Sequence, residues 1–154
     1  MPLSRLPDLS LPGVPGGAAF PLRARGREGT VLLYLHSADC TECRDYVAAL
    51  AEVPEQLRDW DGRVVIVVPG ALAEAERFHA ATDTGFAVVA DPAGRCAEQC
   101  ALEGGGMVIA DQWGEVFFVE AGGVGEHGRP AADEVVEWLR FVAIQCPECQ
   151  GEAL

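Results

Sequence analysis

The sequence predicts an α/β fold in which a central mixed β-sheet is covered by helices on both faces. Segments 30–36, 63–68 and 87–90 are apolar on both faces, as is typical of strands inside a covered sheet. Helical patterns separate these strands, and a hairpin and a last helix follow them, which indicates an α/β protein. With 154 residues, of which 49% are hydrophobic, the chain has the size of one domain with a substantial core.

The two ends of the chain differ in composition from its middle. Residues 1–18 are rich in proline and glycine, so we expect an extended N-terminal lead-in without regular structure. The folded domain is expected over 19–145, beginning with a short strand at 19–23. A C-terminal tail over 146–154 follows it.

The remaining elements follow from residue spacing. Apolar residues from Tyr46 to Leu57 recur at helical spacing, and Pro54 is expected to kink or split that helix. Pro130 is suited to the first turn of the last helix. We further expect helices at 72–82 and 92–102, strands at 107–110 and 115–120, and a turn at 111–114.

The charge of the chain excludes several classes of partner. Acidic residues outnumber basic ones by 24 to 11, which gives a formal net charge of −13. Such a chain repels both nucleic-acid phosphates and anionic lipid headgroups, so we expect neither nucleic acid nor membrane as a partner. Residues 1–15 lack the pattern of a secretory signal, and we expect a cytoplasmic protein. The sequence does not determine an oligomeric state.

The cysteines Cys40 and Cys43 stand where a buried strand is followed by a helix. At a helix N-terminus the unpaired N–H groups and the macrodipole lower the pKa of a thiol, and the thiolate is the nucleophile in disulfide exchange. A second thiol one helical turn later is placed to resolve the mixed disulfide. Half of a structural zinc site, or two inert buried thiols, are the alternatives; the strand-to-helix junction favours redox chemistry.

Neighbouring residues modify this site. The carboxylates of Asp39 and Glu42 oppose formation of a thiolate beside them. His36 lies four residues before Cys40, and its ring would stabilise the thiolate if it reached that residue, although a histidine near a strand end is more often structural. Ser37 belongs to the same thiolate environment.

The other cysteines allow more than one role. Cys146 and Cys149 form a second pair in the tail, and we consider a redox relay to Cys40, an inert tail, or a metal site built from both pairs. Cys96 and Cys100 share a face of a short helix, where small buried hydrophobes are the default interpretation. Cys100 precedes the loop to Gly106, which makes it a further candidate for the relay.

From Leu6 to Arg140 the chain resembles the thioredoxin-like redoxin superfamily, which includes thioredoxins and peroxiredoxins. The resemblance is carried by the lead-in at 7–12, by the strand and cysteine pair at 31–44, by the turn at 111–116, and by the start of the last helix at 128–140. It implies a thioredoxin fold and thiol chemistry at Cys40 and Cys43.

The chain departs from that superfamily at three places. Gly106 stands where the superfamily has a cis-proline facing the cysteines, and Tyr34 stands where thioredoxins have a buried acid. The proline and threonine of the peroxiredoxin signature correspond to Leu33 and Ser37, and its arginine falls near Gly105. These differences weaken the expectation of peroxidase chemistry.

We therefore expect a thiol–disulfide oxidoreductase in which Cys40 is the nucleophile and Cys43 is the resolving thiol. Its partners would be protein or small-molecule disulfides and thiols, and no cofactor or metal is expected. A thiol peroxidase, or a non-catalytic metal-binding protein that kept the fold, are the alternative functions.

Overall fold

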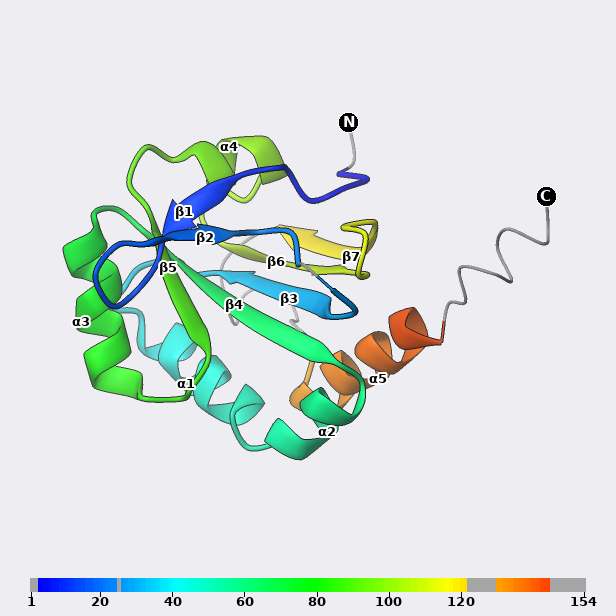
Figure 1. Cartoon of the computed structure of the whole chain (residues 1–154). Helices are drawn as coiled ribbons and strands as arrows, with labels where there is room; N and C mark the ends of the chain where they lie inside the picture. The colour runs from blue at the N-terminus through cyan, green and yellow to red at the C-terminus, as the bar shows by residue number, and fades with distance from the viewer. Residues whose placement is uncertain (1–2, 25, 122–129, 145–154) are drawn as a thin grey trace.

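The computed structural model describes residues 3–24, 26–121 and 130–144. Its main sheet has the strand order β5-β4-β3-β6-β7, as Figure 1 shows. β4 and β5 run parallel to the central strand β3, whereas β6 is antiparallel to it and β7 is antiparallel to β6. The strands are β3 (Gly29–Tyr34), β4 (Gly62–Pro69), β5 (Ala87–Asp91), β6 (Gly106–Ala110) and β7 (Val116–Ala121). The mixed sheet of the predicted thioredoxin fold is confirmed.

Helices cover both faces of this sheet. They are α1 (Thr41–Leu50), α2 (Pro54–Asp59), α3 (Leu72–Thr82), α4 (Arg95–Cys100) and α5 (Ala132–Ala143). Pro54 is the first residue of α2, so the predicted split of the helix after Thr41 is confirmed. Over the residues described, no helix combines the length and the apolar character needed to cross a bilayer.

The central strand β3 is buried on both sides because its side chains alternate between two cores. Leu33 belongs to a first core with residues of α1, α2, α3 and α5, such as Val47 and Phe78. Leu32 belongs to a second core, which contains residues of α4 and the N-terminal segment. The sheet therefore separates the two sets of side chains.

The expectation that residues 1–18 form a lead-in without regular structure is wrong, because this segment contains a β-strand. β1 (Ser10–Pro12) pairs antiparallel with β2 (Ala19–Pro21) in a small second sheet. Leu6, Leu9 and Leu11 are buried in the second core. The prolines and glycines of this segment end the short strand and form its turn, while the leucines between them supply the apolar surface that anchors it.

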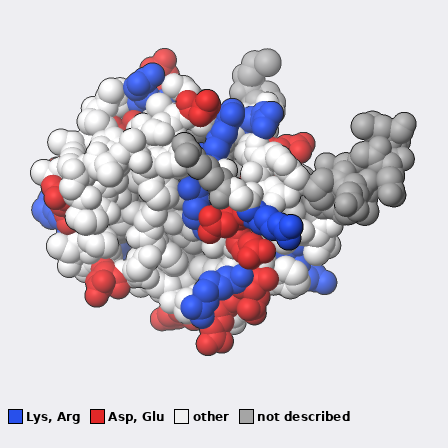
Figure 2. All heavy atoms as spheres, viewed as in Figure 1, with Lys and Arg blue, Asp and Glu red and all other residues white. Residues whose placement is uncertain are grey.

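The surface of the molecule shows where the charged side chains gather. On the face in Figure 2, acidic and basic side chains lie close together in several groups, and the area over β1, β2 and β5 is largely uncharged. Arginines thus stand next to carboxylates on this acidic chain. The same juxtaposition occurs beside the cysteine pair.

Candidate active site

Cys40 occupies the N-cap of helix α1. Its backbone is extended (φ −66°, ψ 115°), and its Sγ accepts a hydrogen bond from the N–H of Cys43 at 3.3 Å. The N–H of Cys40 itself donates to the carbonyl of Ser37 at 3.4 Å, which closes the turn before the helix. Because Cys40 is half-buried, its sulfur both caps the helix and lies near the surface.

Cys43 lies one helical turn later and is fully buried in the first core. Burial raises the pKa of its thiol to about 11, and the hydrogen bond with Cys40 acts in the same direction. The N–H of His36 donates to its Sγ at 3.4 Å and partly opposes that rise. The two thiols therefore differ in accessibility, and Cys43 is protonated at neutral pH.

His36 and Ser37 contribute to the site through their backbones. The hydrogen bond from His36 comes from its backbone N–H and goes to the Sγ of Cys43, which is a structural contact of the kind considered for this residue. Its side chain is exposed, because β3 ends at Tyr34 and residue 36 is already in the loop that leads to the helix. Ser37 accepts from Cys40 through its carbonyl oxygen.

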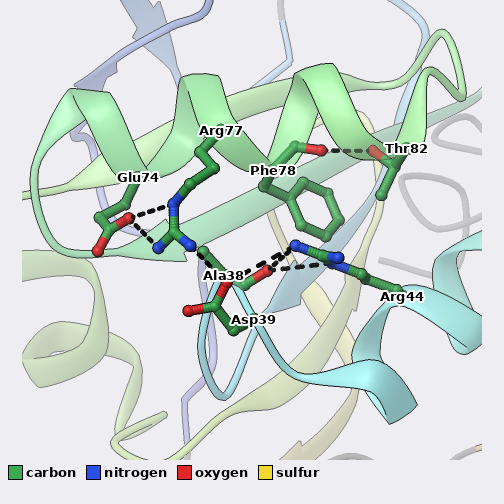
Figure 3. A network of polar contacts seen from close by, with 7 residues as sticks. All are labelled: Ala38, Asp39, Arg44, Glu74, Arg77, Phe78 and Thr82. Carbon is green, nitrogen blue, oxygen red and sulfur yellow. Dashed lines mark hydrogen bonds and ion pairs between the residues drawn. The ribbon is translucent and has the colours of Figure 1, made fainter.

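Two arginines that sequence reasoning missed hold the loop before Cys40 (Figure 3). Arg77 of α3 donates through Nη1 to Asp39 Oδ1 at 2.5 Å. Arg44 of α1 donates through Nε and Nη2 to the carbonyl of Ala38 at 3.2 and 3.0 Å. The carboxylate that was expected to oppose a thiolate is thus paired with a cation. Arg44 directly follows Cys43, so its neighbourhood with the cysteine pair is visible in the sequence, whereas Arg77 carries no such signal.

Gly106 does not reproduce the backbone of a cis-proline loop. It lies in β6, paired with Tyr34 on β3 and with Ala121 on β7. In the described part of the chain the cis peptide bond is that between Val14 and Pro15, so the bond preceding Gly106 is trans. A Cβ here would lie 2.4 Å from Leu102 Cδ2 and 2.6 Å from the carbonyl oxygen of Glu120. Close packing of the backbone therefore explains the glycine.

Cys96 and Cys100 are not brought together with the pair at the start of α1. Both are buried in the second core, while Cys43 lies in the first, so the sheet stands between them. The hydrogen bond with Cys100 and burial both raise the pKa of Cys96 above its ordinary value. This placement fits their default interpretation as small buried hydrophobes.

Tyr34, which stands where thioredoxins have a buried acidic residue, has a structural role. Its hydroxyl donates to Asp91 Oδ2 at 2.7 Å, and burial raises the pKa of the phenol. Asp91 also accepts from the N–H groups of Cys96 and Ala97, each at 3.1 Å, so its carboxylate holds the start of α4. This cluster belongs to the second core, away from Cys43.

The tail pair Cys146 and Cys149 lies outside the described residues, and its relay to Cys40 stays a prediction. Within residues 3–24, 26–121 and 130–144, no group of three or more histidine, cysteine or acidic side chains is suited to hold a metal. The metal site considered for the two pairs together also involves the tail and is likewise outside the described part.

Solved structures show which folds this chain resembles. An AhpC from Mycobacterium tuberculosis shares 16% identity at a TM-score of 0.76, covering 96% of this chain and 97% of that one. The bacterioferritin comigratory protein of Xanthomonas campestris shares 17% identity at 0.77, with 93% and 99% covered. A thioredoxin-like protein from Porphyromonas gingivalis shares 17% identity at 0.71, with 93% and 94% covered.

These identities establish the fold alone. No protein with a curated description matches the chain. The AhpC/TSA family, however, matches residues 3–120. This range includes strand β3, the cysteine pair and the loop to Gly106. Members of this redoxin family are thiol peroxidases or thiol oxidoreductases. Because this match spans most of the chain, the chain belongs to the AhpC/TSA family.

Proposed function

We propose that this protein is a thiol–disulfide oxidoreductase that uses Cys40 as nucleophile and Cys43 as resolving thiol. The observation that carries the proposal is the unequal pair of sulfurs at one helix start. Cys40 is half-buried and accepts a hydrogen bond from the Cys43 N–H, whereas Cys43 is fully buried one turn later. An attacking thiol needs access to a partner, and a resolving thiol needs only access to the attacker.

The reaction follows from these positions. The Cys40 thiolate attacks one sulfur of a partner disulfide, forms a mixed disulfide with it, and releases the other partner sulfur as a thiolate. Cys43 then loses its proton to solvent or to the released thiolate and attacks the Cys40 sulfur. This second step forms the Cys40–Cys43 disulfide and releases the partner as a dithiol. Two electrons pass from the protein to the partner, and the reverse sequence oxidises a dithiol.

Hydrogen bonds around the site favour the first step. The Cys43 N–H points at the Cys40 sulfur, where it stabilises negative charge better than it stabilises a neutral thiol. The positive end of α1 acts in the same direction. Burial of Cys43, which raises its pKa to about 11, keeps that thiol protonated until the attacker has reacted.

A thiol peroxidase is the second candidate, and the AhpC/TSA membership favours it. The Xanthomonas relative is described by its alkyl peroxide reduction activity. In this chain Ser37 replaces the signature threonine with another hydroxyl, but Leu33 replaces the proline, and the position of the arginine falls near Gly105. The reaction with peroxide would therefore lack the cationic donor that stabilises the leaving oxygen.

Two rates measured on one sample test the proposal. Reduced protein is mixed with oxidised glutathione in one assay and with hydrogen peroxide in the other. In each assay the rate at which free thiols are lost is compared with the rate for free cysteine. We expect exchange with the disulfide well above the reference and peroxide consumption near it. Fast peroxide consumption with slow exchange would assign the peroxidase instead, and reference rates for both would leave the protein without either activity.

A further inference from the structure

The residues that flank Cys40 in the chain carry negative charge. Asp39 directly precedes Cys40, and its side chain is 67% exposed. Glu42 is exposed in the first turn of α1. A carboxylate beside a thiolate raises the free energy of the thiolate. Left uncompensated, these charges would slow a nucleophilic Cys40.

Arg77 reaches this loop from another helix. Its Nη1 donates to Asp39 Oδ1 at 2.5 Å, although the two residues are 38 positions apart in the chain. Its Nε donates to Glu74 Oε2 at 3.0 Å, and Nη2 contacts the same oxygen. Glu74 lies one turn earlier on α3, so it holds the guanidinium in the orientation that meets Asp39, as Figure 3 shows.

Arg44 holds the same loop from the side of α1. It donates twice to the carbonyl of Ala38, and its Nη2 lies 3.8 Å from Asp39 Oδ1. Ala38 is buried, so the loop is fixed by core packing and by arginines of two helices. Of the other titratable groups beside Cys40, His36 and Glu42 are exposed, and Cys43 is the buried partner thiol.

We propose that Arg77 is a positioning residue for Cys40, an inference that rests on the function proposed above. It holds the Asp39 carboxylate and offsets the negative charge of the residue that precedes Cys40. Both side chains are about half exposed or more, so solvent screens the pair and the effect is moderate. Arg77 acts through Asp39 and does not touch the reacting sulfur.

The rate at which iodoacetamide alkylates Cys40, followed on its peptide by mass spectrometry across pH 5 to 10, tests this role. Arg77→Gln leaves the charge of Asp39 uncompensated, so we expect alkylation near neutral pH to slow about threefold. Arg77→Lys keeps a cation near Asp39 and should retain most of the wild-type rate. The double variant Asp39→Asn/Arg77→Gln removes both charges and should return to near the wild-type profile.

Arg58→Gln is the matched control, because it removes an exposed arginine of α2 that has no part in this network, and its profile should overlay the wild type. An unchanged profile for Arg77→Gln would overturn the proposal. So would a slower rate that Asp39→Asn does not restore, since that pattern indicates a purely structural role. If Arg77→Gln does not fold, Asp39→Asn alone decides: faster alkylation than wild type supports the proposal, and no change overturns it.

Failure of the positioning role is distinguishable from failure of the proposed function. Alkylation reports the reactivity of the Cys40 sulfur without requiring any disulfide partner. A wild type that exchanges disulfides while Arg77→Gln behaves identically refutes the positioning role alone. A wild type that shows the expected alkylation pattern but exchanges no disulfide refutes the function alone.

Discussion

The N–H of Cys43 donates a hydrogen bond to the Sγ of Cys40 across 3.3 Å, so the buried cysteine holds the half-buried one before any chemistry takes place. The same spacing brings the Cys43 sulfur one helical turn below its partner. The two sulfurs therefore differ in surroundings, because Cys40 is only half-buried and Cys43 is fully buried in the core.

The first prediction concerns the roles of the two sulfurs. Cys43→Ser removes the resolving thiol, so Cys40 should accumulate as a mixed disulfide when the reduced variant meets oxidised glutathione. Cys40→Ser should form no such adduct at residue 43, because that side chain is buried. Intact-mass measurement detects the adduct and peptide mapping locates it. An adduct at Cys43 in the Cys40→Ser variant would reverse the assignment.

A second prediction follows from the raised pKa of Cys43. A thiol whose pKa rises on folding contributes stability that is fully present below its unfolded value and is lost as the pH rises through its folded value. For Cys43 these values are 9.0 and about 11, so the free energy of unfolding of the reduced protein should fall between pH 9 and pH 11. Cys43→Ser, which does not titrate there, should show a smaller fall in denaturant titrations. Parallel curves for both proteins would mean that Cys43 does not titrate as described.

A third prediction addresses Gly106. Alanine at this position would place a Cβ within 2.6 Å of the Glu120 carbonyl, which cannot move without disturbing β7. We expect Gly106→Ala to cost about 1–3 kcal/mol of stability and to lower Tm by several degrees. Gly106→Pro should cost more, because the ring also removes an N–H from the middle of the sheet.

Gly13→Ala is the control for that measurement, since a Cβ there meets its neighbours at 3.4 Å or more, which is ordinary contact. Its Tm should stay close to the wild-type value. If Gly106→Pro were as stable as the wild type, the loop would accept the backbone of the redoxin cis-proline after all.

A fourth prediction separates the two sets of cysteines. Cys96 and Cys100 are at most 1% exposed, so iodoacetamide at pH 8 should leave both unmodified in the folded protein while it labels Cys40. Labelling in urea is the control, and it should reach all three residues. Rapid labelling of Cys100 under native conditions would restore it as a candidate partner for the site.

The sequence was sufficient for the parts of the fold that depend on periodicity. Apolar runs predicted β3, β4 and β5, and Pro54 marked the end of one helix and the start of the next. It was not sufficient for the N-terminal hairpin. Proline and glycine content indicates irregular structure locally, whereas burial of Leu6 and Leu11 against the second core depends on residues far along the chain.

The candidate site, like the fold, could be predicted from the sequence only where its features are local. Cys40 and Cys43 were predicted because their spacing and their junction between strand and helix are local features. The contact between Arg77 and Asp39 joins residues 38 positions apart and has no local signal. The role of Gly106 required knowing that Leu102 and Glu120 pack against its backbone.

The most direct test of the proposed dithiol chemistry is a redox titration of the wild-type protein with mass mapping of every disulfide formed. We expect the disulfide between Cys40 and Cys43 to form as one two-electron step, while Cys96 and Cys100 remain reduced. A Cys40 that oxidises to sulfenic or sulfinic acid without joining Cys43, or a first disulfide that leaves Cys40 free, would contradict it.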